Sequence, residues 1–314
     1  MRSFGPPEVL AVEERPDPQP GSAQVRIAVV GAGTNPVDSF NRLDGAWAGI
    51  TLPAVLGYDV AGVVDAIGPD APAELLGKRV MAMTPFPAGC GGYAEFVVLD
   101  AGLVAVVPDH VSLLDAAAVP LAAGTAYSVM SRLGLQPGAS LLVIGASGGV
   151  GTFLVQMAVA AGVEVIALGG HRSRDLLLGL GATSFVDYGQ GPIAEAVLDA
   201  NRGPVDAVAD LVGGNVLDQA IDVIRPHGQV AAIATPLTLQ LDPLFDANIT
   251  LHCLLIEDSP SRISQLGADL DAGTIRPVIA AVLPFEQAAE AHRRLDSGHA
   301  GGKIVLQARP DITS

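Results

Sequence analysis

A glycine-rich turn between a buried strand and a helix constrains this chain more than any other feature. The apolar run "SLLVIGA" (140–146) comes first, and the helical run "TFLVQMAVAAG" (152–162) follows and ends at a glycine. The glycines between them allow a tight turn and a close approach of backbone to a pyrophosphate, while the helix N-terminus offers free N–H groups. Glycines also let a helix pack on a sheet, but within a strand–turn–helix unit they predict a dinucleotide site. Its expected contacts are Gly145, Ser147, Gly148, Gly149, Val150 and Gly151.

The sequence on either side of this turn predicts two kinds of domain. After it, apolar strands alternate with helices, which indicates a parallel sheet with helices on both faces. Before it, short β-rich pieces such as "QVRIAVVGAG" (24–33) lie between Pro and Gly turns, which is typical of an all-β or barrel-like domain. The last strand, "GGKIVLQA" (301–308), is read as returning to this first domain. The expected domains are 1–115 completed by 284–314, and 116–283.

Charge and cysteine usage exclude several classes of partner. The chain has 17 Lys+Arg against 33 Asp+Glu, so nucleic acid and anionic membrane surfaces are poor partners. The uncharged stretch 133–163 exceeds a membrane span in length, but its Pro and Gly punctuation favours a buried βα unit. Two cysteines, Cys90 and Cys253, make no disulfide framework, and the N-terminus has no long apolar run. A cytoplasmic protein is therefore expected.

A cluster of positive charge, "LGGHRSRD" (168–175), stands out in this acidic chain. It follows the second strand of the parallel unit, where an NAD site usually carries an Asp or Glu for the ribose 2′-OH. The strand ends in glycines instead, and guanidinium and hydroxyl donors suit a 2′-phosphate. A solvated helix start is the alternative, but Arg at a helix N-terminus opposes the helix dipole. We therefore expect NADP(H), bound through Gly170, His171, Arg172, Ser173 and Arg174.

Eight short motifs now point to a known family. In order they are "FGPPEVL", "NPVD", "PAVLGYDVAGVV", "GGYAEF", "AAAVPLAAGTAYSVM", "VIGASGGVG", "LGATSFVDY" and "GGKIVL". Their order resembles that of the zinc-independent, zeta-crystallin-like quinone oxidoreductases of the medium-chain dehydrogenase/reductase superfamily. The resemblance covers essentially the whole chain, except that relatives have most of a β-strand before the first motif.

This resemblance implies both fold and activity. The fold would be a Rossmann-type doubly wound parallel sheet domain inserted into a GroES-like β-rich catalytic domain. NADPH would give a hydride to a quinone or an α,β-unsaturated carbonyl. Dimers are usual in the family and often use the last Rossmann strand, here near 249–256.

The residues that the family's metal-dependent branch uses for zinc are absent from the sequence. Asn35 stands where those relatives have a Cys ligand, and Gly57, Tyr58 and Asp59 replace their Gly-His-Glu. His252 and Cys253 are adjacent in a strand and would point to opposite faces. We expect no bound metal. Hydride transfer to a quinone or enone needs only a positioned cofactor and a proton from water or a weak acid.

Family position also assigns candidate roles, each with a structural alternative. Asn35 is expected to bond the substrate carbonyl or the nicotinamide ribose, or else to form a turn in which Asp38 caps the next helix. Thr125 is expected at the nicotinamide, or bonding its own helix backbone. Tyr127, Tyr188 and Lys303 are expected at the cofactor, or in packing and at a strand edge. Tyr58 would form a wall of the substrate pocket, and Trp47 would contact a flat acceptor or cover the core.

Two other functions remain open from the sequence alone. An enoyl-thioester reductase has the same fold, but a large carrier would need a basic docking patch that this acidic chain lacks. An NADPH-binding sensor or structural protein with little turnover would carry the same binding motifs.

Overall fold

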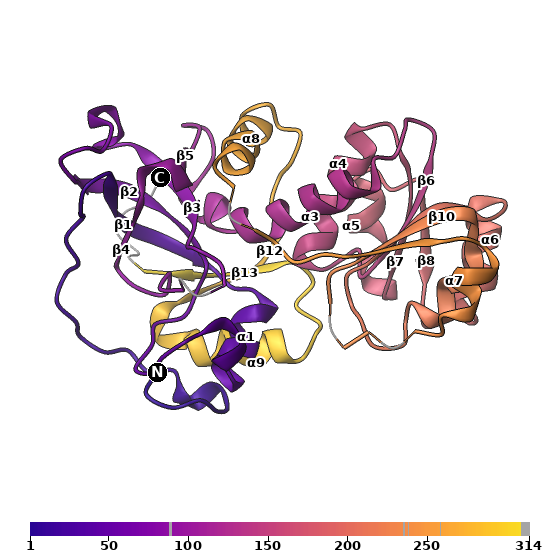
Figure 1. Ribbon diagram of the computed structural model, residues 1–314, viewed down its shortest axis with the longest axis horizontal. Coiled ribbons are helices and arrows are strands. Elements are labelled where there is room, and N and C mark those ends of the chain that lie inside the picture. Colours follow the sequence, from indigo (N-terminus) through magenta and orange to yellow (C-terminus); the bar gives the residue numbers. More distant parts are fainter. Residues whose placement is uncertain (88–89, 235, 238, 258, 309–314) are drawn as a thin grey trace. The chain divides into compact units, whose positions relative to one another are not determined.

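The computed structural model describes residues 1–87, 90–234, 236–237, 239–257 and 259–308 (Figure 1). The chain forms two compact units, Met1–Gly124 with Glu257–Ser314 and Thr125–Ile256. These bounds differ from those expected at 115/116 and 283/284. Helix α2 (Leu113–Ala117) packs on the first unit's sheet, where Leu114 and Ala117 surround Gly31. Strand β12 (Ile279–Pro284), through which the expected boundary runs, belongs to that same sheet.

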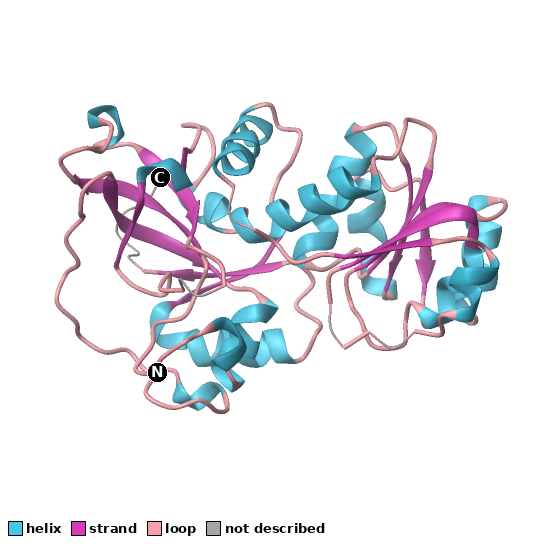
Figure 2. Cartoon of the chain, viewed as in Figure 1, coloured by secondary structure: helices cyan, strands magenta, loops and turns pink. Residues whose placement is uncertain are grey.

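The first unit is built on a seven-stranded sheet, whose strands Figure 2 colours magenta. Its order is β12-β13-β1-β2-β3-β5, and β4 pairs with β1 outside that path. β13 returns from the C-terminus to pair antiparallel with β1, as the sequence predicts. The bounds are β1 Gln24–Gly33, β2 Asp59–Ile67, β3 Arg79–Met83, β4 Phe96–Asp100, β5 Val104–Val106, β12 Ile279–Pro284 and β13 Lys303–Gln307.

The second unit is built on a six-stranded parallel sheet in the order β11-β10-β9-β6-β7-β8. Counted along the chain from β6, this is the order 3-2-1-4-5-6 of a Rossmann domain, which confirms the predicted fold class. β6 lies where the strand order reverses, so the turn that follows it is at the switch point. The bounds are β6 Ser140–Ile144, β7 Glu164–Gly169, β8 Ser184–Asp187, β9 Val205–Asp210, β10 Ile224–Ala232 and β11 Thr250–Cys253.

The helices surround these sheets. α4 packs on β6 and β7, α8 packs on β5, and α9 packs on α1. No described helix is long and apolar enough to cross a bilayer. The α-helices are α1 Pro36–Leu43, α2 Leu113–Ala117, α3 Pro120–Leu133, α4 Gly149–Ala160, α5 Arg174–Gly179, α6 Ile193–Asn201, α7 Asp242–Asp246, α8 Pro260–Asp271 and α9 Ala288–Asp296. Short 3₁₀ turns are η1 Pro7–Val9, η2 Ala46–Ala48, η3 Ala73–Leu75, η4 Ala101–Leu103, η5 His171–Ser173, η6 Asp218–Val223 and η7 Phe285–Gln287.

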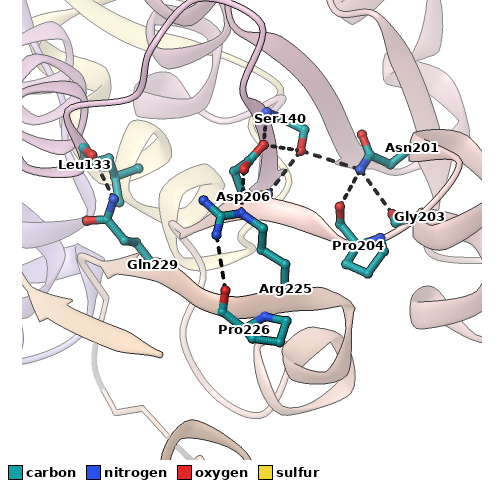
Figure 3. Close-up of polar contacts among 9 residues, drawn as sticks. All are labelled: Leu133, Ser140, Asn201, Gly203, Pro204, Asp206, Arg225, Pro226 and Gln229. Carbon is teal, nitrogen blue, oxygen red and sulfur yellow. Dashed lines mark hydrogen bonds and ion pairs between the residues drawn. The ribbon is translucent and has the colours of Figure 1, made fainter. Parts of the chain in front are cut away.

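A polar cluster fastens the amino ends of the parallel strands (Figure 3). The Asp206 carboxylate accepts hydrogen bonds from the Ser140 N–H at 2.7 Å and its hydroxyl at 3.0 Å, and pairs with Arg225 at 2.6 Å. Partial burial acts against ionisation, but these donors hold the pKa of Asp206 below its usual value. Ligands of such sheets bind at the opposite, carboxyl ends. This cluster therefore has a structural role, and the ligand site is expected at the carboxyl ends of the strands.

Candidate cofactor and substrate sites

The glycine-rich turn has the geometry that a pyrophosphate needs. Gly145 follows β6 with φ +81°, a conformation that favours glycine, and Gly148 precedes the first residue of α4. A Cβ on Gly151 would lie 2.4 Å from the Gly145 carbonyl oxygen, so only glycine lets the helix start this close to the strand. No side chain caps the first turn of α4. Its free N–H groups remain available to an anion.

A buried acid beside this turn was missed by the sequence reasoning. Asp210 ends β9, and one carboxylate oxygen accepts the Val212 and Gly213 N–H groups, each at 3.0 Å. It thereby holds the half-exposed Val212 side chain against Gly145, where an added Cβ would meet Val212 at 2.7 Å. The signal in the sequence was an acid closing the buried strand "VADLVG" next to the switch point. Val212 provides an apolar surface beside the predicted pyrophosphate loop.

The basic segment forms an exposed turn at the carboxyl end of β7. His171, Arg172 and Arg174 are exposed, and the Arg174 guanidinium lies 5.8 Å from the centre of the Phe185 ring. The Ser173 hydroxyl donates to the Gly170 carbonyl at 2.7 Å, so its one proton is engaged within the turn. Both arginines extend from a turn that Ser173 holds in shape. Both guanidinium groups are therefore accessible to an anion, and that of Arg174 lies over the Phe185 ring.

A carboxylate does stand near this turn, although β7 itself ends in glycines. Asp187, at the end of the neighbouring β8, lies 3.5 Å from His171 Nδ1. Its oxygens already accept the Gly189 N–H at 2.9 Å and the Gln190 amide at 3.0 Å. The sequence reasoning missed this proximity because it depends on the parallel register that pairs Gly169 with Asp187. Asp187 is thus a turn-forming acid that also faces the basic segment.

The three other cofactor candidates of the second unit lie in different settings. Thr125 is buried in α3, whereas Tyr127, two residues on, is 38% exposed. Tyr188 follows β8 and is half exposed, and a Cβ on Gly170 would meet its hydroxyl at 2.8 Å. The structure therefore brings Tyr188 to the basic turn. Tyr127 and Tyr188 both keep surface that a ligand can contact.

In the first unit, a buried ion pair between Lys303 and Asp59 connects two of the predicted site residues, Asn35 and Lys303. The Lys303 ammonium donates to the Asn35 side-chain oxygen at 2.6 Å, the Thr34 carbonyl at 2.9 Å and Asp59 at 3.0 Å. The Asn35 amide also donates to Asp59 at 2.9 Å. All three hydrogens of the ammonium therefore have acceptors within the chain. Lys303 is buried at the start of β13, and its direct neighbours are the other members of this cluster.

Asp38 caps the helix that follows Asn35. Its carboxylate accepts the Asn35 N–H at 2.8 Å, and the sequence predicted this capping. The same oxygen accepts the Tyr93 hydroxyl at 2.9 Å, which in turn lies 3.3 Å from His292 Nε2. Burial raises the pKa of Asp38 to about 7, and burial lowers the pKa of His292 to about 4. Asp38 and His292 are therefore both neutral in weakly acidic solution.

Tyr58 is buried between α1 and the loop after β3. Its hydroxyl accepts the Asn41 amide at 2.6 Å and donates to the Pro87 carbonyl at 2.5 Å. Burial raises the pKa of Tyr58 well above its ordinary value. Its ring lies 5.0 Å from that of Phe86, whose ring lies 6.2 Å from that of Trp47. The Tyr58 hydroxyl thus links α1 to the loop after β3, and its ring packs against Phe86, which in turn packs against Trp47.

The donor set at the family's metal position does not fit zinc. Asn35 and Tyr58 are poor ligands in place of Cys and His, and a lysine ammonium already neutralises Asp59. Within the described parts of the chain, no three His, Cys, Asp or Glu side chains gather as a metal site.

Comparisons with known proteins cover both units. Residues 21–109 match the family described as alcohol dehydrogenase GroES-like domain, and residues 180–306 match the family described as zinc-binding dehydrogenase. An NADPH-dependent alkenal/one oxidoreductase of Arabidopsis thaliana chloroplasts is 30% identical over 98% of this chain and 78% of its own length.

Solved structures match over nearly the whole chain as well. The quinone oxidoreductase of Coxiella burnetii is 30% identical, with a TM-score of 0.89 and 98% of both chains covered. An NAD-dependent alcohol dehydrogenase is 31% identical, with a TM-score of 0.93 and the same coverage. The names of these relatives give different cofactors and substrates. The cofactor and substrate of this chain therefore have to be inferred from its own residues.

Proposed function

Because the chain belongs to the medium-chain dehydrogenase/reductase superfamily, we propose that it is an NADPH-dependent reductase of quinones or α,β-unsaturated carbonyls. The observation that carries this proposal is the pairing of two features. The basic turn at 171–174 favours a phosphorylated ribose, and the Asn35–Asp59–Lys303 cluster stands where metal-dependent alcohol dehydrogenases of this superfamily hold zinc. The named relatives that act on quinones and alkenals agree with that assignment.

The glycine-rich turn, with the free N–H groups of Gly149 and Val150, binds the pyrophosphate of the cofactor. Arg172 and Arg174 bind the 2′-phosphate, and Tyr188 flanks the adenosine end of the basic turn. Thr125 contacts the nicotinamide half, and Tyr127 approaches the pyrophosphate. When bound, NADPH supplies the hydride.

Asn35 is held so that it can orient the acceptor carbonyl or the nicotinamide ribose. Lys303 and Asp59 fix its side chain, and Asp38 fixes its backbone N–H. Lys303 is thus a positioning residue that acts through Asn35. Reduction adds one hydride and one proton to the acceptor, and water supplies the proton.

One parallel assay tests this function. NADPH consumption is followed at the nicotinamide absorbance with a benzoquinone, a small enone and a crotonyl thioester. Turnover of the quinone or the enone supports the proposal, whereas turnover of the thioester alone would replace it with an enoyl-thioester reductase. Tight NADPH binding with no acceptor reduced would indicate a sensor or structural protein. Activity that survives chelator treatment, in protein free of zinc by elemental analysis, tests the proposed zinc independence.

We also propose a homodimer formed through the region near 249–256. β11 is the edge strand of the parallel sheet, so its outer backbone groups have no neighbouring strand in the described sheet. Leu255 is 64% exposed just after it, and Phe245 of α7 is 79% exposed. An apolar sheet edge of this kind is stabilised by pairing with a second copy.

A further inference from the structure

Asp187 ends β8 and faces the basic turn that follows the neighbouring strand β7 (Figure 1). The parallel register pairs it with Gly169, and one of its carboxylate oxygens lies 3.5 Å from His171 Nδ1. The Asp187 side chain is 12% exposed, whereas that of His171 is 77% exposed. A largely buried carboxylate therefore stands beside an exposed cluster of positive charge.

Local hydrogen bonds hold this carboxylate in place. One oxygen accepts the Gly189 N–H at 2.9 Å, and the other accepts the Gln190 side-chain amide at 3.0 Å. These bonds close a turn around Tyr188, whose hydroxyl lies so near Gly170 that an added Cβ there would meet it at 2.8 Å. The charge of Asp187 is thus fixed beside the basic turn and does not swing out into solvent.

A fixed negative charge at this place affects the two nicotinamide cofactors differently. The 2′-phosphate of NADPH carries a charge of about −1.5 to −2 at neutral pH, which the arginines attract and Asp187 repels. The ribose 2′-hydroxyl of NADH is neutral and experiences no such repulsion. Because a partly buried charge is screened less than an exposed one, Asp187 offsets part of the attraction that Arg172 and Arg174 provide.

We propose that Asp187 limits the preference of this protein for NADPH over NADH, and so keeps NADH usable as a second hydride donor. This inference rests on the proposed function, because it requires that the 2′-phosphate bind at the basic turn. The two are separable, because cofactor binding is measured without any acceptor.

Asp187→Asn tests the inference, because it removes the charge and keeps the shape of the side chain. The amide oxygen can still accept the Gly189 N–H, so the turn around Tyr188 should persist. At low ionic strength we expect the affinity for NADPH, measured by calorimetry, to rise about fivefold, and that for NADH to change by less than about twofold. The nicotinamide-free pair 2′,5′-ADP and ADP should show the same contrast, since the effect acts at the adenosine end of the cofactor.

Salt separates this electrostatic effect from a structural one. In about 0.5 M NaCl the gain in NADPH affinity should shrink to less than about twofold, whereas a gain caused by altered packing of the turn would persist. Glu164→Gln is the matched control, because it removes the same charge from the opposite end of β7, about 17 Å away along the strand. It should change the affinity for neither cofactor.

The possible failures are distinct. An unchanged NADPH affinity in Asp187→Asn, or equal gains for NADPH and NADH, would overturn the role given to Asp187. Wild type that binds no NADPH would refute both the cofactor site and this inference. Wild type that binds NADPH and reduces no acceptor would refute the reductase function alone, and the contrast between the cofactors in Asp187→Asn would still support the inference.

Discussion

The Lys303 ammonium lies 3.0 Å from the Asp59 carboxylate, and both side chains are almost completely buried. The second Asp59 oxygen accepts the Leu121 N–H at 2.7 Å, so the carboxylate has no remaining access to water. Removing the cation alone would leave a buried, uncompensated charge.

Lys303→Met is therefore expected to lower the free energy of unfolding by about 3–5 kcal/mol in urea titrations. Arg293→Met is the control, since Arg293 forms only exposed ion pairs with Glu8 and Glu290 and should change stability by less than about 1 kcal/mol. Similar small losses of stability in both variants would show that the buried Asp59 carboxylate does not need the Lys303 ammonium to compensate its charge.

Arg172→Ala and Arg174→Ala should change cofactor preference rather than general binding. Each substitution is expected to lower the affinity for NADPH, measured by calorimetry, about tenfold to a hundredfold, because a charge-assisted hydrogen bond to the 2′-phosphate is lost. NADH lacks that phosphate and should bind as before. Arg202→Ala removes an arginine from the end of α6 and serves as the control. Equal losses of affinity for NADPH and NADH would show that the basic turn does not recognise the 2′-phosphate.

Gly151→Ala tests the close start of α4. The new Cβ would lie 2.4 Å from the Gly145 carbonyl oxygen, so the helix must move. We expect a loss of about 1–3 kcal/mol in stability and of most NADPH affinity. Gly179→Ala is the matched control, because its Cβ meets nothing within 4 Å and alanine favours the helix. A Gly151→Ala protein with normal stability and NADPH affinity would contradict the role given to this glycine.

The sequence predicted elements whose signals are local, and missed contacts set by register. The parallel strands were predictable because runs such as 140–144 are wholly buried and bounded by glycine. The family was predictable from ordered motifs, which the comparisons confirm. The Lys303–Asp59 pair spans 244 positions, and it forms only because β13 returns to β1 while β2 lies on the other side of β1. Likewise, the contact of Asp187 with His171 follows from the pairing of β7 and β8, which local patterns do not encode.

Asp38 and His292 should give the stability opposite dependences on pH. Asp38 has a pKa of about 7 in the fold and 3.8 as the reference, so between these values the folded state holds an extra proton and stability falls as pH rises. His292 has a pKa of about 4 in the fold and 6.5 as the reference, so in that window the unfolded state holds the extra proton and stability rises with pH. The two slopes largely cancel in wild type.

Single variants should expose each slope. In Asp38→Asn only His292 still titrates, so between pH 4.5 and 6.5 the free energy of unfolding should rise by up to about 1.4 kcal/mol per pH unit. In His292→Gln only Asp38 still titrates, so the free energy of unfolding should fall by up to the same amount per pH unit. Urea titrations at each pH measure both. Tyr93, Arg42, Asp296, Asp59 and Lys303 also face these groups and remain unchanged. Slopes of the same sign in the two variants would contradict the assignment.

The edge strand β11 provides the last prediction. Leu255 is 64% exposed immediately beyond it, and a carboxylate there would have to enter the proposed apolar contact between two copies. Leu255→Asp should therefore convert a dimer to monomers by light scattering, with the far-ultraviolet circular dichroism unchanged. Val12→Asp changes a residue that is 68% exposed in the other unit, and should stay dimeric. If wild type is already monomeric at tens of micromolar, the proposed interface is wrong, because a contact that buries a whole sheet edge should persist at that concentration.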